Sequence, residues 1–347
     1  MNRLKINVLL QTLMFLFTCG LLLFCVTTAV DAKIVFCIGN DLYVMNDDGS
    51  GRRRLTHNTT AEDNRPRWAP DGTQIVFTRY MDKAKAETSE LFIINADGTE
   101  PQRLTHNKFR ESYPAWSPDG RYIAFEGRDN EVHIMEVATR AVTQLTFPID
   151  ERHHGATAPD WSPDGTQITY ERFSRVRKGV GVGFAGKLIY VMSADGQHQR
   201  RLQPRRRISD DMMQFEPRWS TDGQRILFDD CRWIGDRTRC RLSFARIGGV
   251  AHIITDLYNR FGDNFLISYA GWMENDRAIL FAMKRLDKPA PNYDLYRYAF
   301  DTRKLRRLTH ESSNEKYPDW TEGALSVSPN GKVATQWGNI KQPAHAD

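Results

Sequence analysis

Six tryptophans recur along the chain at intervals of 45 to 58 residues, and this spacing constrains the fold more than any other feature. They are Trp68, Trp116, Trp161, Trp219, Trp272 and Trp320. Four of them open a turn that reads Trp-Ser-Pro-Asp-Gly or a close variant, at 68–72, 116–120, 161–165 and 219–223. A repeat of roughly 40–50 residues with strand-like content is typical of a β-propeller.

Each repeat reads as four short strands. The first strand ends at the tryptophan, and the Pro-Asp-Gly that follows favours a tight turn because proline presets φ and glycine suits the last position. The second strand alternates apolar and polar residues, as in 74–77, and the third is apolar, as in 91–94. The fourth ends in a Leu-Thr pair, as at 104–105. Apolar runs separated by Asp-Gly turns indicate hairpins.

The two ends of the repeat region complement each other. Residues 33–56 read as the second, third and fourth strands of a repeat, whereas 317–320 read as a first strand without partners. One blade shared between the two segments would close the ring and leave no open edge. The sequence therefore predicts an all-β fold, a six-bladed β-propeller whose N- and C-terminal segments share the closing blade. A further hairpin at 325–337 is the basis of a seven-bladed alternative.

The recurring elements resemble the TolB-type β-propeller repeat, a WD40-like repeat with Asp-Gly turns. The resemblance rests on Trp-Ser-Pro-Asp-Gly, on Tyr-Val-Met-Asn-Asp-Asp-Gly at 43–49 and on the Arg-Leu-Thr elements, and it covers roughly 33–323. The best-known member is periplasmic, carries a small α/β domain before its propeller and binds other envelope proteins. The resemblance implies a six-bladed propeller with a binding function, and it covers the propeller part only.

Residues 1–32 differ in composition from the rest of the chain. Arg3 and Lys5 precede a long apolar stretch at 8–30, and small residues follow it. This pattern predicts a secretory signal peptide and hence a periplasmic or secreted protein. Because the apolar stretch is longer than usual, an uncleaved anchor is the alternative, and any membrane contact would run through this segment. The predicted organisation is a leader at 1–32, a propeller at 33–323 and a C-terminal hairpin or tail at 324–347.

Three cysteines follow the leader, and export permits disulfides. Cys231 and Cys240 bracket a loop between the second and third strands of one blade, so we expect them to form a disulfide. Cys37 is then unpaired, and its place in an apolar run predicts a small buried residue in a strand.

Basic residues concentrate at 172–207, where ten Lys or Arg accompany one acid, Asp195. Part of this excess lies in an insertion at 173–187, and long loops on rigid scaffolds often carry function. One hypothesis is a mobile basic flap that meets an acidic partner, and the other, which we favour, is a solvated loop. The predicted contact residues of the flap are Arg175, Arg177, Lys178, Lys187, Arg205, Arg206 and Arg207.

The residue three positions before each tryptophan opens the innermost strand near one end of the central channel. In order these residues are Arg65, Tyr113, Ala158, Glu216, Tyr269 and Tyr317. Tyrosine, arginine and carboxylates that converge on a funnel suit the recognition of a peptide or a sugar. In the alternative interpretation, these side chains only pair with one another at the rim of the channel and bind no partner. The predicted partner-binding residues of the funnel are Arg65, Glu111, Tyr113, His153, His154, Glu216, Tyr269 and Tyr317.

The sequence gives weak support to catalysis. It has no Gly-x-Ser-x-Gly elbow and no room for a hydrolase domain beside the propeller. His153 and His154, with Glu111 or Glu216, are the basis of one enzymatic hypothesis, a polysaccharide lyase-like enzyme with a metal site in the funnel.

The favoured prediction is a non-catalytic binding or scaffold module without a cofactor or a bound metal. Its expected partner is an envelope or extracellular protein or an anionic glycan. Nucleic acid is excluded for an exported chain, and the expected state is a monomer.

Overall fold

The structure is a computed structural model that describes residues 34–82, 89–148, 155–178, 181–204, 212–234, 237–262 and 264–322, except for the side chains of 174–185 and 233–238. The predicted leader and the predicted C-terminal tail lie outside the described residues. Within them, no helix is long and apolar enough to span a membrane.

The described strands form six antiparallel sheets of four strands each, one sheet per repeat. The first blade consists of β4 (Glu62–Trp68), β5 (Gln74–Tyr80), β6 (Ser89–Asn95) and β7 (Gln102–Arg103). The second consists of β8 (Ser112–Trp116), β9 (Tyr122–Glu126), β10 (Val132–Glu136) and β11 (Val142–Gln144). The third consists of β12 (Ala156–Trp161), β13 (Gln167–Lys178), β14 (Gly181–Ser193) and β15 (Arg200–Arg201). The fourth consists of β16 (Met212–Trp219), β17 (Ile226–Ile234), β18 (Arg237–Ala245) and β19 (His252–Ile253). The fifth consists of β20 (Phe265–Met273), β21 (Ala278–Arg285), β22 (Tyr293–Ala299) and β23 (Lys304–Arg307).

The sixth blade is built from both ends of the described chain. It consists of β24 (Glu315–Trp320), β1 (Ile34–Ile38), β2 (Asp41–Met45) and β3 (Arg53–Arg54). Antiparallel pairing places Ile34 opposite Trp320, so the first described strand joins the last. This confirms the six-bladed propeller with a shared closing blade, and the described residues form no seventh blade.

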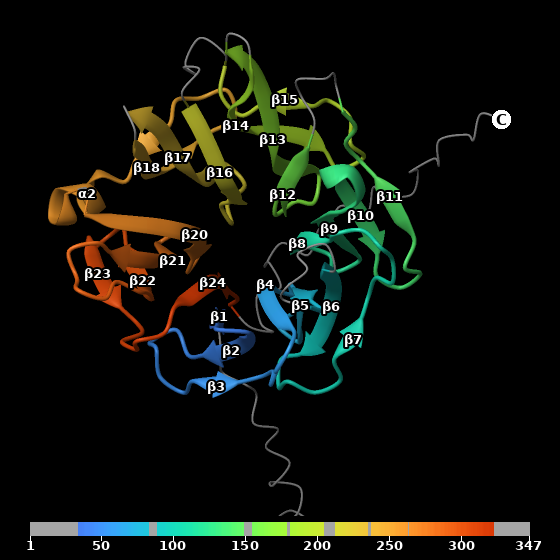
Figure 1. Cartoon of the computed structure of the whole chain (residues 1–347), viewed down its shortest axis with the longest axis horizontal. Helices are drawn as coiled ribbons and strands as arrows, with labels where there is room; N and C mark the ends of the chain where they lie inside the picture. Colours follow the sequence, from blue (N-terminus) through green and yellow to red (C-terminus); the bar gives the residue numbers. More distant parts are fainter. Residues whose placement is uncertain are drawn as a thin grey trace, which may run out of the picture. The chain divides into compact units, whose positions relative to one another are not determined.

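The innermost strand of each blade contacts the innermost strands of the two neighbouring blades. β4, β8, β12, β16, β20 and β24 follow one another around the centre, and β24 contacts β4 to complete the ring (Figure 1). Among the described residues the helical elements are the turn η2 (Arg128–Asn130) and the short helix α2 (Thr255–Phe261). The helix follows the fourth blade and packs Leu257 into the core between the fourth and fifth blades.

The apolar core consists of six clusters, one between each pair of neighbouring blades. The repeated tryptophan belongs to the cluster that joins its blade to the preceding one. Trp68, for example, packs with Val35 and Leu42 of the sixth blade. Replacing a large buried side chain of this kind by alanine costs about 3–5 kcal/mol. The tryptophan period therefore reflects packing between blades.

The threonine of the Leu-Thr pair after the fourth strand links the outer strands of a blade by hydrogen bonds. In the first blade, Thr105 Oγ1 donates to Glu90 Oε2 at 2.6 Å and accepts from the Leu91 backbone N–H at 3.0 Å. Arg103 pairs with the same Glu90 carboxylate. The corresponding arginine–acid pairs recur in the sixth and fifth blades, at Arg54–Asp41 and Arg307–Asp294.

A β-bulge interrupts every innermost strand at the same place. The ladder with the second strand shifts register three positions before each tryptophan. The residue there has a left-handed φ, between 50° and 61°, in all six blades: Arg65, Tyr113, Ala158, Glu216, Tyr269 and Tyr317. Glycine is the usual residue at such a bulge, and another residue type costs about 1–2 kcal/mol there. None of the six is glycine, so each bulge holds a side chain at a cost in backbone strain.

We predict that Ala158→Gly leaves the free energy of unfolding unchanged or raises it by up to about 1 kcal/mol, because glycine relieves the strain at the bulge. The matched control is Ala124→Gly in β9, where φ is not positive and the alanine is fully buried. That change should lower the free energy of unfolding by about 1 kcal/mol. Chemical denaturation measures both values, and an equal loss in both variants would contradict the strain argument.

Candidate functional site

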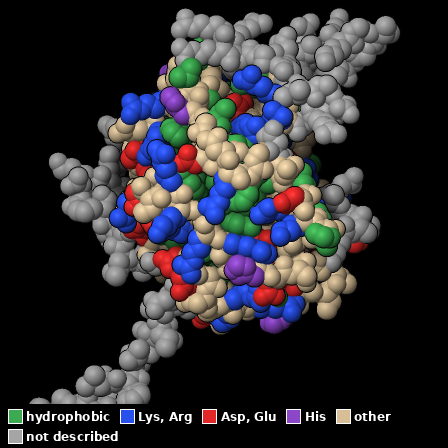
Figure 2. All heavy atoms as spheres, turned by 90° about the vertical axis from the view of Figure 1, so that its left-hand side faces the viewer, with side chains coloured by type: hydrophobic (Ala, Val, Ile, Leu, Met, Phe, Trp, Pro, Cys, Tyr) green, Lys and Arg blue, Asp and Glu red, His purple; other side chains and the backbone are tan. Residues whose placement is uncertain are grey.

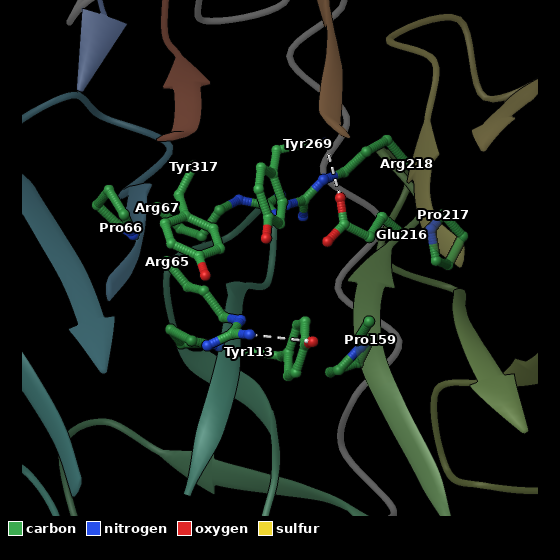
Figure 3. Close-up of a pocket in the computed structure, with 12 residues that line it drawn as sticks. Arg65, Pro66, Arg67, Tyr113, Pro159, Glu216, Pro217, Arg218, Tyr269 and Tyr317 are labelled. Atoms are coloured by element: carbon green, nitrogen blue, oxygen red, sulfur yellow. Dashed lines mark hydrogen bonds between the residues drawn. The ribbon is translucent and has the colours of Figure 1, made fainter. Parts of the chain in front are cut away.

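The six bulge residues converge on one pocket at the end of the channel, which we call the mouth pocket. It has about 20 Å³ of free volume. It is lined by Arg65, Tyr113, Ala158, Glu216, Tyr269 and Tyr317, by the prolines that follow several of them, and by Arg67 and Arg218. Figure 3 shows that the arginine, the tyrosines and the glutamate point toward a common centre. The structure therefore brings together five of the residues expected at the funnel.

Arg65 lies at the centre of the mouth pocket among tyrosine rings. Its guanidinium stands 4.0 Å from the ring centroid of Tyr113 and 5.0 Å from that of Tyr317. Nη2 donates to the Tyr113 hydroxyl at 3.1 Å. A guanidinium over an aromatic face is stabilised by the quadrupole of the ring. The tyrosines thus hold this cation, and its charge also acts on the Glu216 carboxyl group.

The opposite wall of the mouth pocket is formed by Glu216 and Tyr269. Glu216 Oε2 accepts the Tyr269 backbone N–H at 2.8 Å, which links the fourth blade to the fifth. The Tyr269 ring lies against Tyr317, with centroids 4.1 Å apart. Burial raises the pKa of Glu216 well above its usual value, and the neighbouring Asp229 and Glu171 raise it further. The pocket therefore offers tyrosine rings, arginine side chains and a single carboxyl group.

Glu111 does not line the mouth pocket. Glu111 is buried beside Asn107, whose amide donates to it at 2.5 Å, and burial raises its pKa to about 7. His153 and His154 lie outside the described residues. Among the residues that the structure describes, no group of three or more His, Cys, Asp or Glu side chains is arranged to hold a metal ion.

Below the mouth pocket, charged residues one position before the tryptophans meet across the channel. Arg67 of the first blade pairs with Asp160 of the third at 2.6 Å and with Asp319 of the sixth at 3.1 Å. Arg218 of the fourth blade approaches Asp160 at 3.3 Å. We call these four residues the ion girdle: Arg67, Asp160, Arg218 and Asp319.

The acids of the ion girdle also bind the backbone of neighbouring blades. Asp160 accepts the Trp219 N–H and Asp319 accepts the Trp68 N–H, each at 2.8 Å. A second pocket, with about 260 Å³ of free volume, begins at the two girdle arginines and continues toward the tryptophan ends of the inner strands. The girdle therefore lies between two pockets and connects four of the six blades.

The predicted basic flap corresponds to the long hairpin of β13 and β14. The backbone of Arg175, Arg177 and Lys178 belongs to β13, but their side chains lie outside the described part, as do Arg205, Arg206 and Arg207 entirely. Lys187 is the predicted flap residue whose side chain the structure describes. Its ammonium pairs with Glu171 at 2.8 Å and lies 4.3 Å from the Phe173 ring centroid.

The three cysteines among the described residues all lie in strands. A disulfide joins Cys231 and Cys240, which are directly opposite each other in β17 and β18. Cys37 is free and buried in β1, as expected for a small core residue, and burial raises the pKa of its thiol well above the usual value.

The family of the chain follows from its sequence. It matches the model of the TolB beta propeller domain over residues 38–172 and 79–235. Together these matches cover more than half of the 347 residues. The chain belongs to the TolB β-propeller domain family. A search of the curated proteins finds no match.

Solved structures share the TolB-type propeller fold at low sequence identity. TolB from Acinetobacter baumannii superposes with a TM-score of 0.63 at 17% identity, covering 84% of this chain and 67% of that chain. A putative TolB from Agrobacterium tumefaciens gives a TM-score of 0.50 at 19% identity, covering 64% of this chain and 76% of that one. An oligogalacturonate lyase in complex with manganese gives 0.51 at 12% identity, covering 80% and 74%. At such identities the likeness shows the fold alone.

Sequence reasoning missed the ion girdle, although the repeat contained the signal for it. The girdle residues stand one position before their tryptophans, just as the bulge residues stand three positions before. Aligning the repeats on the tryptophan places two arginines and two aspartates in that column. Sequence reasoning also missed Glu171 and Asp229, which come from the second strands of the third and fourth blades.

We predict that Arg67→Met lowers the free energy of unfolding by about 3 kcal/mol, because it leaves buried girdle carboxylates without their shared cation. The control is Arg121→Met, which removes an exposed arginine 3.7 Å from Glu136. Its effect should stay within about 0.5 kcal/mol. Urea unfolding measures both, and similar losses would show that the girdle adds no special stability.

Proposed function

We propose that the chain is an exported, non-catalytic binding module and that its mouth pocket engages a segment of an envelope or extracellular protein. The observation that carries this proposal is the set of six strained bulges. A chain that needed the bulges only to shape its blades would favour glycine, which adopts this φ without strain. The side chains found there instead line one pocket.

Backbone strain of this kind concentrates at functional sites, where the surrounding structure holds it in place. The mouth pocket also has the composition of an interaction hot spot, since tyrosine and arginine are enriched among residues that dominate binding energy. By contrast, the outer wall around α2 and the fifth blade shows basic and acidic side chains interspersed with apolar ones (Figure 2). Selective recognition is therefore better supported at the mouth pocket than on this wall.

Of the partners expected from the sequence, a protein fits better than an anionic glycan. The mouth pocket combines three tyrosine rings and prolines with arginines and one carboxyl group, a composition typical of a protein-binding hot spot. Membership in the TolB β-propeller domain family also supports a protein-binding propeller. No observation favours the lyase hypothesis, because the likeness to the oligogalacturonate lyase is one of fold.

The proposed export rests on two features. Residues 1–32 have the pattern of a secretory leader. The Cys231–Cys240 disulfide suits an oxidising compartment such as the periplasm or the extracellular space.

The proposal is tested by cross-linking capture from envelope extract with the full chain as bait. Replacing Tyr113 and Tyr269 by alanine should reduce capture of the partner by about ten-fold or more, because two aromatic contacts are lost. Phe147→Ala is the matched control, since it removes a 60% exposed aromatic side chain that does not line the pocket. Its capture should equal that of the unchanged chain.

A bait that lacks 174–186 separates the mouth pocket from the hairpin. Equal capture by this bait and by the unchanged chain is expected. Loss of capture with the hairpin deletion but not with the double tyrosine variant would contradict the proposal and move the site to the hairpin.

A further inference from the structure

The second pocket has far more free volume than the mouth pocket, about 260 Å³ against about 20 Å³. Since about 10–15 Å³ is enough for one water molecule, the mouth pocket has room for little more than a water, whereas the second pocket has room for a small organic molecule. Pro70 and Thr221, which belong to the turns after two of the tryptophans, line the second pocket and are exposed. The pocket therefore opens to solvent at the turn end of the channel.

A glycine leaves a gap in the wall of the second pocket. Gly271 stands one position before Trp272, where four other blades carry the residues of the ion girdle. Its φ is not positive, and a Cβ added there would meet no atom of the described residues within 4 Å apart from its chain neighbours. Neither the backbone nor the packing therefore requires glycine, although glycine in a strand is less stable than alanine. A glycine inside a strand often marks the close approach of a ligand.

The girdle charges leave hydrogen-bond donors available to the second pocket. Arg67 and Arg218 extend toward the channel centre from opposite sides, and both line this pocket (Figure 3). Asp160 pairs with both arginines, Asp319 pairs with Arg67, and each acid also accepts a backbone N–H of a neighbouring blade. The Arg218 side chain, by contrast, makes a single hydrogen bond to a described residue, the 3.3 Å contact with Asp160. Because a guanidinium has several N–H donors, Arg218 can donate to a ligand.

The charges around the second pocket nearly cancel. Arg67 and Arg218 face Asp160, Asp319 and Glu322 in its lining. An anion would meet the carboxylates and a cation would meet the guanidinium groups, and like charge across a site disfavours binding. An apolar ligand would leave the donors of Arg218 without partners, which is costly. The pocket therefore favours a neutral ligand that accepts hydrogen bonds.

The remaining wall of the second pocket is apolar and aromatic. It consists of Pro70, Trp219, Trp272, Leu280, Pro318 and Trp320. Apolar walls with a few polar groups are typical of small-molecule sites. A sugar ring matches this combination, because it has C–H faces and hydroxyl groups that both donate and accept hydrogen bonds.

We propose that the second pocket binds one neutral sugar unit. The ring lies against the apolar wall beside Gly271, and a hydroxyl oxygen accepts hydrogen bonds from Arg218. This inference goes beyond the proposed function and does not depend on it, because the ion girdle lies between the two pockets. A free saccharide and the end of a glycan chain present the same ring and hydroxyl groups, so the chemistry of the site is the same for both sources.

The experiment is calorimetric titration of the full chain with methyl glycosides in neutral and charged forms. The neutral probes are the methyl glucoside, galactoside and N-acetylglucosaminide, and the charged probes are the methyl glucuronide, galacturonide and glucosaminide. At least one neutral probe should bind with a millimolar or lower Kd, and at least about ten-fold more tightly than its charged counterpart. Failure of every neutral probe to bind, or equal or tighter binding of the charged forms, overturns the proposal.

Longer saccharides of the sugar that binds identify its source. Tighter binding of the trisaccharide than of the methyl glycoside would support the site and assign it to the end of a glycan chain. Binding of the methyl glycoside without binding of the trisaccharide would support the site and assign it to a free saccharide.

Gly271→Leu tests the location of the site directly, because its side chain would fill the open volume beside the girdle. Since a Cβ meets no described neighbour there, the Tm should be kept while binding of the neutral glycoside is lost. Gly271→Ala is the matched control. It adds one methyl group, should retain binding and should not lower the Tm. Retained binding in Gly271→Leu would place the sugar elsewhere and contradict the proposal.

Arg218→Met provides a second test that does not depend on the folding of the leucine variant. It removes the donors and leaves Arg67 between the two girdle acids. Affinity for the neutral glycoside should fall by about ten-fold or more, because a hydrogen bond from a charged group is lost. Arg121→Met, which lies outside the pocket, should bind like the unchanged chain. Equal affinity of Arg218→Met and the unchanged chain would overturn the proposed contact.

Discussion

The pairing of β1 with β24 is the interaction on which the rest of the structure depends. It supplies three strands of the closing blade from one end of the described chain and the innermost strand from the other. Because β24 then contacts β4, all six innermost strands surround one axis, and residues at equivalent repeat positions meet at the same depth of the channel. Convergence at the mouth pocket and at the ion girdle is therefore a consequence of ring closure.

Successive positions of the innermost strand serve different purposes. The tryptophan packs against the preceding blade, and the residue before it contributes to the ion girdle in four blades. The bulge residue, three positions before the tryptophan, carries positive φ and lines the mouth pocket. Stability is thus supplied by apolar packing and paired charges, while the six strained bulge residues line the pocket. This division is common where a rigid scaffold presents a binding site.

Much of the architecture could be predicted because the repeat encodes it locally. The spacing of the tryptophans predicted the number of blades, and the incomplete repeats at the two ends predicted the shared closing blade. The position three residues before each tryptophan predicted which side chains would meet at the channel end. The backbone conformation of the bulges and the side-chain pairings between strands could not be predicted from the repeat. The left-handed φ at Tyr113 or Glu216 leaves no mark in residue type, since glycine is absent there. Glu171, Glu216 and Asp229 come from three different strands, β13, β16 and β17, and the pairing of Lys187 with Glu171 depends on side-chain direction that sequence does not show.

The central claim is that the bulge residues are retained for recognition rather than for stability. The most direct test is a variant with glycine at Tyr113, Glu216 and Tyr269, on which partner capture and the free energy of unfolding are both measured. We expect capture to be lost while the free energy of unfolding falls by no more than about 2 kcal/mol, because relief of strain offsets the lost contacts. Retained capture, or a ring that loses most of its stability, would contradict the claim.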